Sequence, residues 1–333
     1  MSTWLITGGS GFLGRHVLNQ ISASDLRISR VLVLGRRFPD NWPAESFLRA
    51  DLNDPAGLSR ALITVRPSVI LHLAGQTPPA DEANLHRVNA GGTLALLRAL
   101  HAIGRPCRVI TAGSAAELGP VPEASLPADE STPCRPDSPY GLSKWFASQA
   151  TVASPRPIEG IAARIFNPIG PGMPASQAFG RFAAQLAVPS PDPLRLQTGN
   201  LDARRDLIDA RDVADALIAL ALRGHPGRVY HVGTGRSHRI GDGLDRLIAL
   251  SARRVIVSSD PTPGPGPIDS RASIAAIERD TGWAPRIPID QSLADLWNSV
   301  RSRSLRPDAP HVSPAPPAHR AESSTLARPP ATD

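Results

Sequence analysis

Two residues four positions apart could perform proton chemistry in this chain of 333 residues. Tyr140 is one of two tyrosines, and Lys144 is the only lysine among 36 basic Lys and Arg side chains. On a helix, positions i and i+4 lie on the same face. An ammonium group beside a phenol favours the phenolate and lowers the phenol pKa from its ordinary value of roughly 10. We therefore expect Tyr140 to exchange a proton with a substrate oxygen near neutral pH.

The elements around this pair should bring it to one edge of a sheet. Ser138 and Pro139 are typical of an N-cap and a first-turn proline, so a helix should begin there and carry Tyr140 and Lys144. A predicted strand over 108–111 runs into Ala112-Gly113-Ser114, and an open α/β sheet places its chemistry at such carboxyl strand ends. A chance meeting of a surface tyrosine with a solvated lysine is the alternative.

The beginning of the chain carries a glycine-rich turn that could hold a dinucleotide. Glycines there allow a tight turn and close approach of the backbone to a pyrophosphate, while the N–H groups of the following helix bind phosphate. The turn follows a short apolar strand over 4–7 and opens a helical pattern, which is the context that the motif requires. An ordinary tight turn is the alternative. The predicted cofactor contacts are Gly8, Gly11, Phe12, Leu13 and Gly14.

The second strand, over 31–34, ends in a pair of guanidinium groups. A dinucleotide fold that prefers NAD usually carries an acid there to hold the ribose 2′-hydroxyl. This chain carries Arg36 and Arg37 instead, and arginine binds phosphate in a bidentate manner. We therefore expect NADP(H) as the preferred cofactor, with NAD(H) possible and a solvated arginine pair as the alternative.

Two further strand ends should contribute to the same cofactor site. Asp51 and Leu52 close a third short strand over 47–50 and should lie near the adenine. A strand over 69–73 runs into the small residues Ala74 and Gly75, which would let a cofactor lie against the backbone, and Leu73 is a further predicted contact. His72 within that strand is expected to be a packed side chain, not a ligand.

Composition excludes several other classes of protein. The net charge of +6 suits an anionic small molecule, but basic residues do not interleave with aromatics, so we expect no nucleic acid partner. Cys107 and Cys134 are too few for a disulfide framework or a zinc site, and we expect free thiols and no metal. No apolar run reaches membrane-spanning length, and the strand at the N-terminus leaves no room for a signal peptide. We therefore expect a cytoplasmic enzyme with no membrane partner.

At this point the chain resembles the extended short-chain dehydrogenase/reductases, which are nucleotide-sugar epimerases, dehydratases and reductases. The glycine turn, Asp51-Leu52, the His-Leu-Ala-Gly strand end, Asn89, Ser114 and the Tyr140/Lys144 pair come in that family's order. The resemblance continues through about residue 300 in four later segments: 164–172, 205–213, 230–235 and 281–285.

The resemblance implies a Rossmann-type α/β fold, a doubly wound parallel sheet with a smaller, discontinuous α/β lobe for the substrate. We predict a cofactor domain over 1–166, to which 206–235 return, and a substrate lobe over 167–205 and 236–302. Residues 303–333 are rich in proline, alanine and serine and are expected to form a disordered tail. By analogy with the family we also expect a homodimer that pairs through the helix of Tyr140 and Lys144 and a long predicted helix over 83–101, which could contribute Leu94, Leu96, Leu97 and Leu100. The same leucines could equally serve the core.

The resemblance also implies roles for individual residues. Tyr140 would exchange the proton on the substrate oxygen, Lys144 would bind the nicotinamide ribose, and Ser114 would hydrogen-bond the same substrate oxygen. Asn89 would belong to the cofactor site. The substrate would be a nucleoside-diphosphate sugar held by Gln76, Ser114, Asn167, Arg205 and Arg271.

The reaction class depends on the residues after Ser114. Dehydratases of the family place an Asp-Glu pair there, whereas this chain has Ala115 and Ala116, with Glu117 one position further on. Together with the expected NADP(H), this favours reduction of the C4 keto group of a 4-keto-6-deoxyhexose nucleotide sugar. An NAD-dependent 4-epimerase or 4,6-dehydratase is the alternative enzyme, and a non-catalytic NADP-binding regulator is the alternative of another class.

Overall fold

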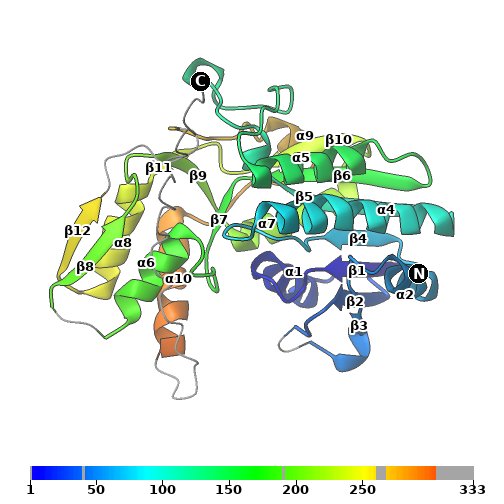
Figure 1. The fold of residues 1–333 in the computed structure, drawn as a ribbon, viewed down its shortest axis with the longest axis horizontal. Coiled ribbons are helices and arrows are strands. Elements are labelled where there is room, and N and C mark those ends of the chain that lie inside the picture. The colour runs from blue at the N-terminus through cyan, green and yellow to red at the C-terminus, as the bar shows by residue number, and fades with distance from the viewer. Residues whose placement is uncertain (1, 40–41, 190–191, 260–267, 305–333) are drawn as a thin grey trace, which may run out of the picture.

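The computed structural model describes residues 2–39, 42–189, 192–259 and 268–304. Nearly all of the predicted tail therefore lies outside the described residues. The described part forms a large parallel sheet with helices on both sides, together with a smaller lobe beside it (Figure 1).

Seven parallel strands form the central sheet. The chain builds this sheet outward from its first strand in both directions, so the order reverses between the first and fourth strands. The predicted doubly wound sheet is confirmed. In spatial order the strands are β3 (Phe47–Arg49), β2 (Arg30–Gly35), β1 (Thr3–Thr7), β4 (Val69–His72), β5 (Cys107–Ser114), β6 (Ile158–Ile165) and β10 (Arg228–Val232).

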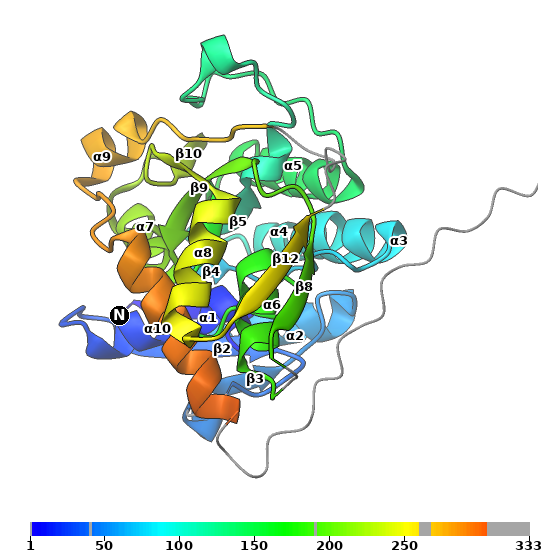
Figure 2. The ribbon, with the colours of Figure 1, turned by 90° about the vertical axis from the view of Figure 1, so that its left-hand side faces the viewer.

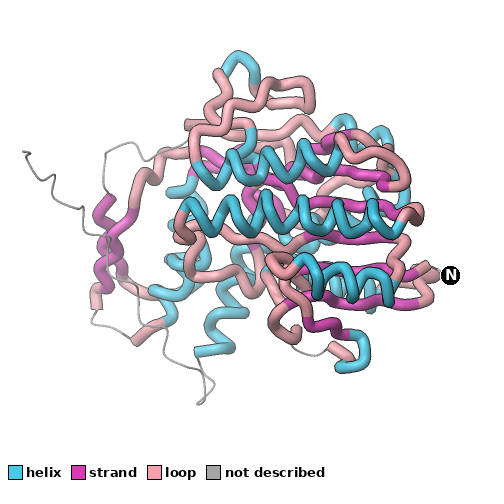
Figure 3. Tube along the Cα trace, turned by 45° about the vertical axis from the view of Figure 1, so that its right-hand side comes forward, coloured by secondary structure: helices cyan, strands magenta, loops and turns pink. Residues whose placement is uncertain are grey.

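Helices bury the apolar side chains on both faces of this sheet, as strands buried on two sides require. One face packs against α1 (Phe12–Ala23), α7 (Ala210–Arg223) and α9 (Ala275–Thr281). The other packs against a row of helices that Figure 3 shows in front of the strands, α2 (Pro55–Val65), α4 (Gly92–Ile103) and α5 (Pro139–Val152).

One predicted helix is interrupted where the sequence suggested continuity. The span 83–101 is divided into α3 (Glu82–Leu85), a π-helical turn η2 (His86–Gly91) and α4. Such turns are rare in proteins, and those that occur are often found at functional sites. The turn contains Asn89, whose buried side chain hydrogen-bonds the backbone of Gln76, so the helix is widened where it supports a neighbouring loop.

The smaller lobe has its own apolar core and two small sheets (Figures 1 and 2). Its helices and two-stranded sheet are α6 (Ala178–Ala187), α8 (Ile240–Ser251), α10 (Ile289–Ser304), β8 (Leu194–Thr198) and β12 (Val255–Ser259). A three-stranded sheet consists of β7 (Asn167–Ile169), β9 (Arg204–Asp209) and β11 (Ser237–Arg239). Because β6 is followed at once by β7, the carboxyl end of the central sheet leads directly into this lobe. The predicted domain division stays a proposal, since β9 lies across its boundary at residue 206.

Candidate active site

The predicted triad comes from two neighbouring elements. Ser114 ends β5, and Tyr140 and Lys144 lie in the first turns of α5. Ser138 caps this helix by accepting a hydrogen bond from the Gly141 N–H at 3.1 Å, as predicted. The Ser114 hydroxyl accepts the Ala116 N–H at 3.2 Å. Ser114 also acts on the pKa of the Tyr140 phenol, in the direction opposite to burial.

Lys144 points across β5 toward the end of β4. Its ammonium group donates to the Ala112 carbonyl. A Cβ atom added at Gly75 would lie 3.6 Å from Nζ of Lys144 and 2.9 Å from Oδ1 of Asn89, so these three predicted cofactor contacts are neighbours. Burial lowers the pKa of Lys144 to about 8, although the negative charge of Glu117 acts in the opposite direction.

The prediction that the pKa of the Tyr140 phenol lies below its ordinary value is wrong. Burial raises the pKa of Tyr140 above its ordinary value, the Ser114 side chain opposes this, and the charge of Glu117 raises it further. Lys144 is directed at a backbone carbonyl, and desolvation outweighs the effect predicted from the i, i+4 spacing. Tyr140 is therefore a protonated phenol at neutral pH.

Asn89 is a structural centre of the same region. Its side-chain amide donates to the Gln76 carbonyl at 3.0 Å and to the Ser143 hydroxyl at 2.9 Å, and its oxygen accepts the Gln76 N–H at 2.7 Å. Because Ser143 lies in α5 and Gln76 follows β4, Asn89 joins the helix that carries the triad to the predicted cofactor site.

The glycine turn fits a dinucleotide. Gly8 has a φ of +73°, and a Cβ atom there would lie 2.7 Å from the Ala74 nitrogen, so this turn approaches the end of β4 closely. A Cβ atom at Gly14 would lie 2.2 Å from the Gly8 carbonyl oxygen, which fixes α1 directly against the turn. Gly11 is the N-cap of α1 without a side-chain cap, so the first N–H groups of the helix can bind phosphate. Phe12 and Leu13 begin that helix.

The second cofactor contact region lies after β2. The guanidinium of Arg36 is 4.0 Å from the Asp51 carboxylate and its side chain is 58% exposed, which leaves it free to reorient. Arg37 is also exposed. Asp51 accepts two hydrogen bonds from Asn53, and Leu52 is buried in the core against α4, so only the backbone of Leu52 remains for a ligand.

The predicted phosphate-binding arginines share one acidic neighbour. Arg271 lies 3.5 Å from Asp269, and the charge of Asp269 also acts on Arg205, whose pKa is lowered chiefly by burial. The structure thus brings Arg205 and Arg271 to the same carboxylate. Asn167 lies at the start of β7 and donates to the Asp206 carbonyl at 3.1 Å, which ties it to β9.

The residues after Ser114 bear on the alternative of dehydration. Ala115 and Ala116 are partly buried and begin a short 3₁₀ turn, η3 (Ala115–Glu117). The Glu117 side chain is fully buried and forms an ion pair with Arg164 at 3.1 Å. Glu117 is therefore committed inside the protein and is not placed to act as an acid or base on a substrate.

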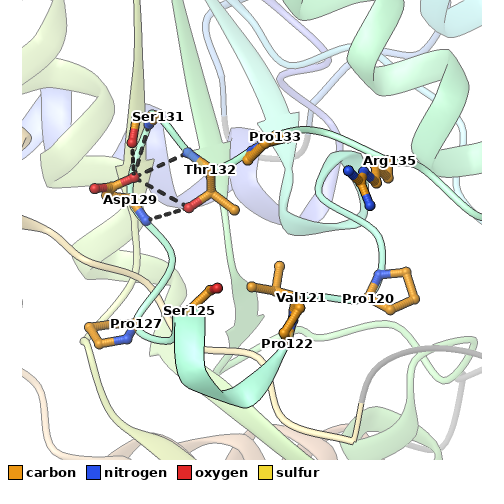
Figure 4. A pocket seen from close by; sticks show the side chains of 10 residues that line it. All are labelled: Pro120, Val121, Pro122, Ser125, Pro127, Asp129, Ser131, Thr132, Pro133 and Arg135. Atoms are coloured by element: carbon orange, nitrogen blue, oxygen red, sulfur yellow. Dashed lines mark hydrogen bonds between the residues drawn. The ribbon is translucent and has the colours of Figure 1, made fainter.

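A pocket of about 450 Å³ lies in the loop between Ser114 and α5 (Figure 4). Asp129 organises one of its walls by accepting hydrogen bonds from Ser131 and Thr132. No residue of the triad lines this pocket, so we do not assign it to the chemistry. Its other lining residues are Pro120, Val121, Pro122, Ser125, Pro127, Pro133 and Arg135.

His72 is a packed residue, as predicted. Its Nε2 donates to the Thr93 hydroxyl, because that hydroxyl donates its own proton to the Asn89 carbonyl. Its Nδ1 accepts from the Thr7 hydroxyl at 2.8 Å, and Thr7 accepts the Ala74 N–H. Burial lowers the pKa of His72 to about 3, with the charge of Lys144 adding to the effect. Sequence reasoning missed this chain of contacts, because its members lie up to 86 positions apart.

The described residues form neither a metal site nor a membrane-spanning helix. Within the described residues, the side chains that bind metals do not gather into a cluster that could hold an ion. Nor does any described helix have the length and apolarity needed to cross a membrane. Cys107 is buried and Cys134 is partly buried, and both are free thiols.

Comparison with known proteins agrees with this geometry. The model of the NAD dependent epimerase/dehydratase family matches residues 4–233. The chain is similar to GDP-6-deoxy-D-mannose reductase of Pseudomonas aeruginosa, with 32% identity over 90% of this chain and 97% of the relative. It is 29% identical to dTDP-6-deoxy-L-talose 4-dehydrogenase (NAD(P)(+)) of Kitasatospora kifunensis, over 88% of this chain and 94% of the relative.

Solved structures give the same result. RMD from Pseudomonas aeruginosa, complexed with NADPH, superposes with a TM-score of 0.79 and 30% identity over 91% of this chain and 98% of that chain. UDP-glucose 4-epimerase from Thermus thermophilus, complexed with NAD, gives a TM-score of 0.77 and 26% identity over 90% and 99% of the two chains. From its sheet, its glycine turn and these matches, the chain belongs to the NAD dependent epimerase/dehydratase family.

Proposed function

We propose that this chain, an NAD(P)-dependent oxidoreductase acting on a nucleotide sugar, reduces the C4 keto group of a 4-keto-6-deoxyhexose nucleotide with NADPH. The observation that carries the proposal is the position of Ser114, at the end of β5, and of Tyr140, in the first turn of α5, together with the two alanines that follow Ser114 where dehydration needs an acid and a base. Burial raises the pKa of Tyr140, so the phenol is protonated at neutral pH. The relatives named as a 6-deoxymannose reductase and a 6-deoxytalose 4-dehydrogenase support the proposal.

The residues divide the work of reduction. A bound nicotinamide ring supplies the hydride. Tyr140 donates the proton to the C4 oxygen, because its raised pKa keeps the phenol protonated at neutral pH. The Ser114 hydroxyl would donate to the same oxygen of the bound substrate, and Lys144, beside Gly75 and Asn89, would bind the nicotinamide ribose.

Two sets of arginines would recognise the charged ends of the ligands. Arg36 and Arg37 follow β2, where the 2′-phosphate of NADP would lie, and they are the reason to prefer NADP over NAD. Arg205 and Arg271 would form charge-assisted hydrogen bonds with the substrate diphosphate. Asp269 lies 3.5 Å from Arg271, and its charge also acts on Arg205, so the diphosphate would replace or share this carboxylate as the partner of the two guanidinium groups.

The test is NADPH oxidation with 4-keto-6-deoxyhexose nucleotides as substrates. Turnover should require the keto sugar, and Tyr140→Phe should lower kcat by at least about 100-fold, the scale of general acid catalysis, while NADPH still binds. A redox-neutral change in the sugar without NADPH consumption would instead indicate the 4-epimerase. Equal loss of NADPH binding and turnover would remove Tyr140 from its assigned role.

We also propose that the protein is a homodimer that pairs through α5. Leu142 and Phe146 are one helical turn apart and each is 44% exposed. Replacing both with glutamate should give a monomer in sedimentation experiments, whereas an unchanged oligomeric state would exclude this seam. The leucines of the preceding helix lie partly or fully inside the subunit, and they are Leu94, Leu96, Leu97 and Leu100.

A further inference from the structure

A buried carboxylate joins the two elements that carry the triad. Oε1 of Glu117 accepts the Ser114 N–H at 2.8 Å and the Ser148 hydroxyl at 2.8 Å. Ser114 is the last residue of β5, whereas Ser148 lies one turn beyond Lys144 in α5. One carboxylate oxygen thus holds the strand that ends in Ser114 at a set distance from the helix of Tyr140 and Lys144.

The other carboxylate oxygen is neutralised inside the protein. Oε2 of Glu117 accepts from Nε of Arg164 at 3.1 Å, and the side chains of the pair are 0% and 2% exposed. Nη1 of Arg164 donates to Nε2 of His231 at 2.9 Å, because Nδ1 of His231 donates to the Ala128 carbonyl. Nη2 of Arg164 donates to Sγ of Cys134 at 3.0 Å. Each nitrogen of the guanidinium therefore has a partner, and both oxygens of the Glu117 carboxylate are held by hydrogen bonds.

The backbone is shaped to admit this carboxylate. A Cβ atom at Gly113 would lie 2.4 Å from Oε1 of Glu117 and 2.8 Å from Oγ of Ser148. Any larger residue at 113 would therefore displace the junction of strand and helix. Glu117 also belongs to the same 3₁₀ turn that Ser114 caps, so the turn, the strand end and α5 meet at one charged group.

We propose that Glu117 is a positioning residue for the reduction: the hydrogen bonds of its carboxylate set the distance between Ser114 and the Tyr140/Lys144 helix. This inference rests on the proposed function only for its effect on turnover. The geometry itself comes from the hydrogen bonds to Ser114 and Ser148.

The charge of Glu117 has the sign that reduction requires. It raises the pKa of Tyr140 and also the pKa of Lys144, against the effect of burial on the lysine. Both effects favour the protonated phenol and the ammonium at neutral pH. Arg164 faces the opposite carboxylate oxygen, so it compensates the buried charge without standing between Glu117 and the triad.

Glu117→Gln separates charge from shape, because the amide oxygen can still accept from Ser114 and Ser148. The matched control is Glu159→Gln, which removes a partly buried ion pair with Arg108 that joins β5 and β6 at the end of these strands far from Ser114. Since Lys144 is the only lysine, ¹⁵N-lysine labelling gives a single side-chain signal whose titration reports its pKa directly. This measurement needs no substrate.

For Glu117→Gln we expect the titration midpoint of Lys144 to fall by about one pH unit, the low end of what a neighbouring opposite charge contributes. We also expect kcat per folded molecule to fall about 10- to 100-fold, because small displacements of catalytic groups are costly, with NADPH affinity kept. Glu159→Gln should change neither quantity. An unchanged Lys144 titration together with unchanged kcat per folded molecule would overturn the inference, even if the melting temperature falls.

A second variant covers the case in which Glu117→Gln does not fold. If Glu117→Gln is unstable because Arg164 loses its counter-charge, the double variant Glu117→Gln/Arg164→Met removes both buried charges and is read in the same two ways. If the wild-type protein reduces no keto sugar, the proposed function fails, whereas the Lys144 titration still decides the role of Glu117.

Discussion

Replacing the lysine of the triad should stabilise the protein while abolishing its activity. Burial lowers the pKa of Lys144 from 10.5 to about 8, so keeping this ammonium protonated inside the native protein costs free energy. Lys144→Met removes that cost and keeps a flexible side chain of similar length. The prediction concerns the sign of the stability change, because loss of a hydrogen-bonded partly buried residue more often destabilises a protein.

The size of the expected change in the free energy of unfolding follows from the lowered pKa of Lys144. A difference of about 2.5 pH units at 1.36 kcal/mol per unit sets a ceiling of about 3 kcal/mol. Loss of the hydrogen bond to the Ala112 carbonyl and solvent screening of a partly buried group oppose this gain. We therefore expect Lys144→Met to raise the free energy of unfolding by about 1–2 kcal/mol at pH 7.

The pH dependence of the free energy of unfolding provides a second, independent test of the same reasoning. Between about pH 8 and pH 10.5 the unfolded wild-type chain holds a proton at residue 144 that the native protein has lost. The free energy of unfolding of the wild type should therefore rise with pH in this window relative to Lys144→Met. Titration of tyrosines and cysteines is common to both proteins and cancels in the difference.

The assay is urea unfolding of both proteins at pH 7 and at pH 10, with turnover measured in parallel. A variant less stable than the wild type at pH 7, or a difference that does not shrink at pH 10, would refute the reasoning. Either result would mean that the ammonium is well solvated in the native protein.

Three other predictions follow from the same geometry. Turnover in the direction of reduction should be steady below pH 8 and fall up to tenfold per pH unit above it, because the Lys144 ammonium loses its proton with a pKa of about 8. A rate that rises with pH above 8 would contradict the role of the ammonium. Gly14→Ala places a Cβ atom 2.2 Å from the Gly8 carbonyl oxygen, so it should destabilise the protein by about 1–3 kcal/mol and weaken NADPH binding, whereas Gly199→Ala, with nothing within 4 Å, should do neither in thermal unfolding and titration. Arg36→Ser/Arg37→Ser should weaken NADPH binding about 10- to 100-fold with NADH little changed, as expected for lost charge-assisted hydrogen bonds; equal loss for both cofactors would place the 2′-phosphate elsewhere.

Local patterns predicted the first half of the fold well. The glycine turn, the strand before it and the helix after it are determined by neighbouring residues, and the structure has them where the sequence indicated. Strand β6 was not predicted, because its sequence IEGIAARI mixes glycine, alanine and charged residues and becomes apolar only inside the sheet. The π-helical turn at Asn89 was not predicted either, since its cause is a contact with Gln76, 13 positions away.

The features of the site also divide into those that the local sequence predicts and those that depend on the folded chain. The order of Ser114, Tyr140 and Lys144 could be read from the sequence, because strand ends and helix caps are local features. The direction of the phenol pKa shift could not, because it depends on burial and on the charge of Glu117, which itself lies beside Arg164 only in the folded chain. Spacing along a helix brings two side chains to one face, but it does not decide where each of them points.

The environment of residue 144 explains why a chain otherwise committed to arginine keeps one lysine. The ammonium group has a backbone carbonyl, that of Ala112, as its acceptor and lies close to Gly75 and Asn89. A guanidinium has five donors in a rigid plane and stays charged at every accessible pH, so burial there would leave donors unsatisfied with no neutral form as relief. The pKa of the buried lysine falls only to about 8, so the ammonium form still prevails at neutral pH, and the free-energy cost of burying it is tolerable. Glu117 reduces that cost further, so the buried carboxylate and the single lysine are best understood as one electrostatic unit.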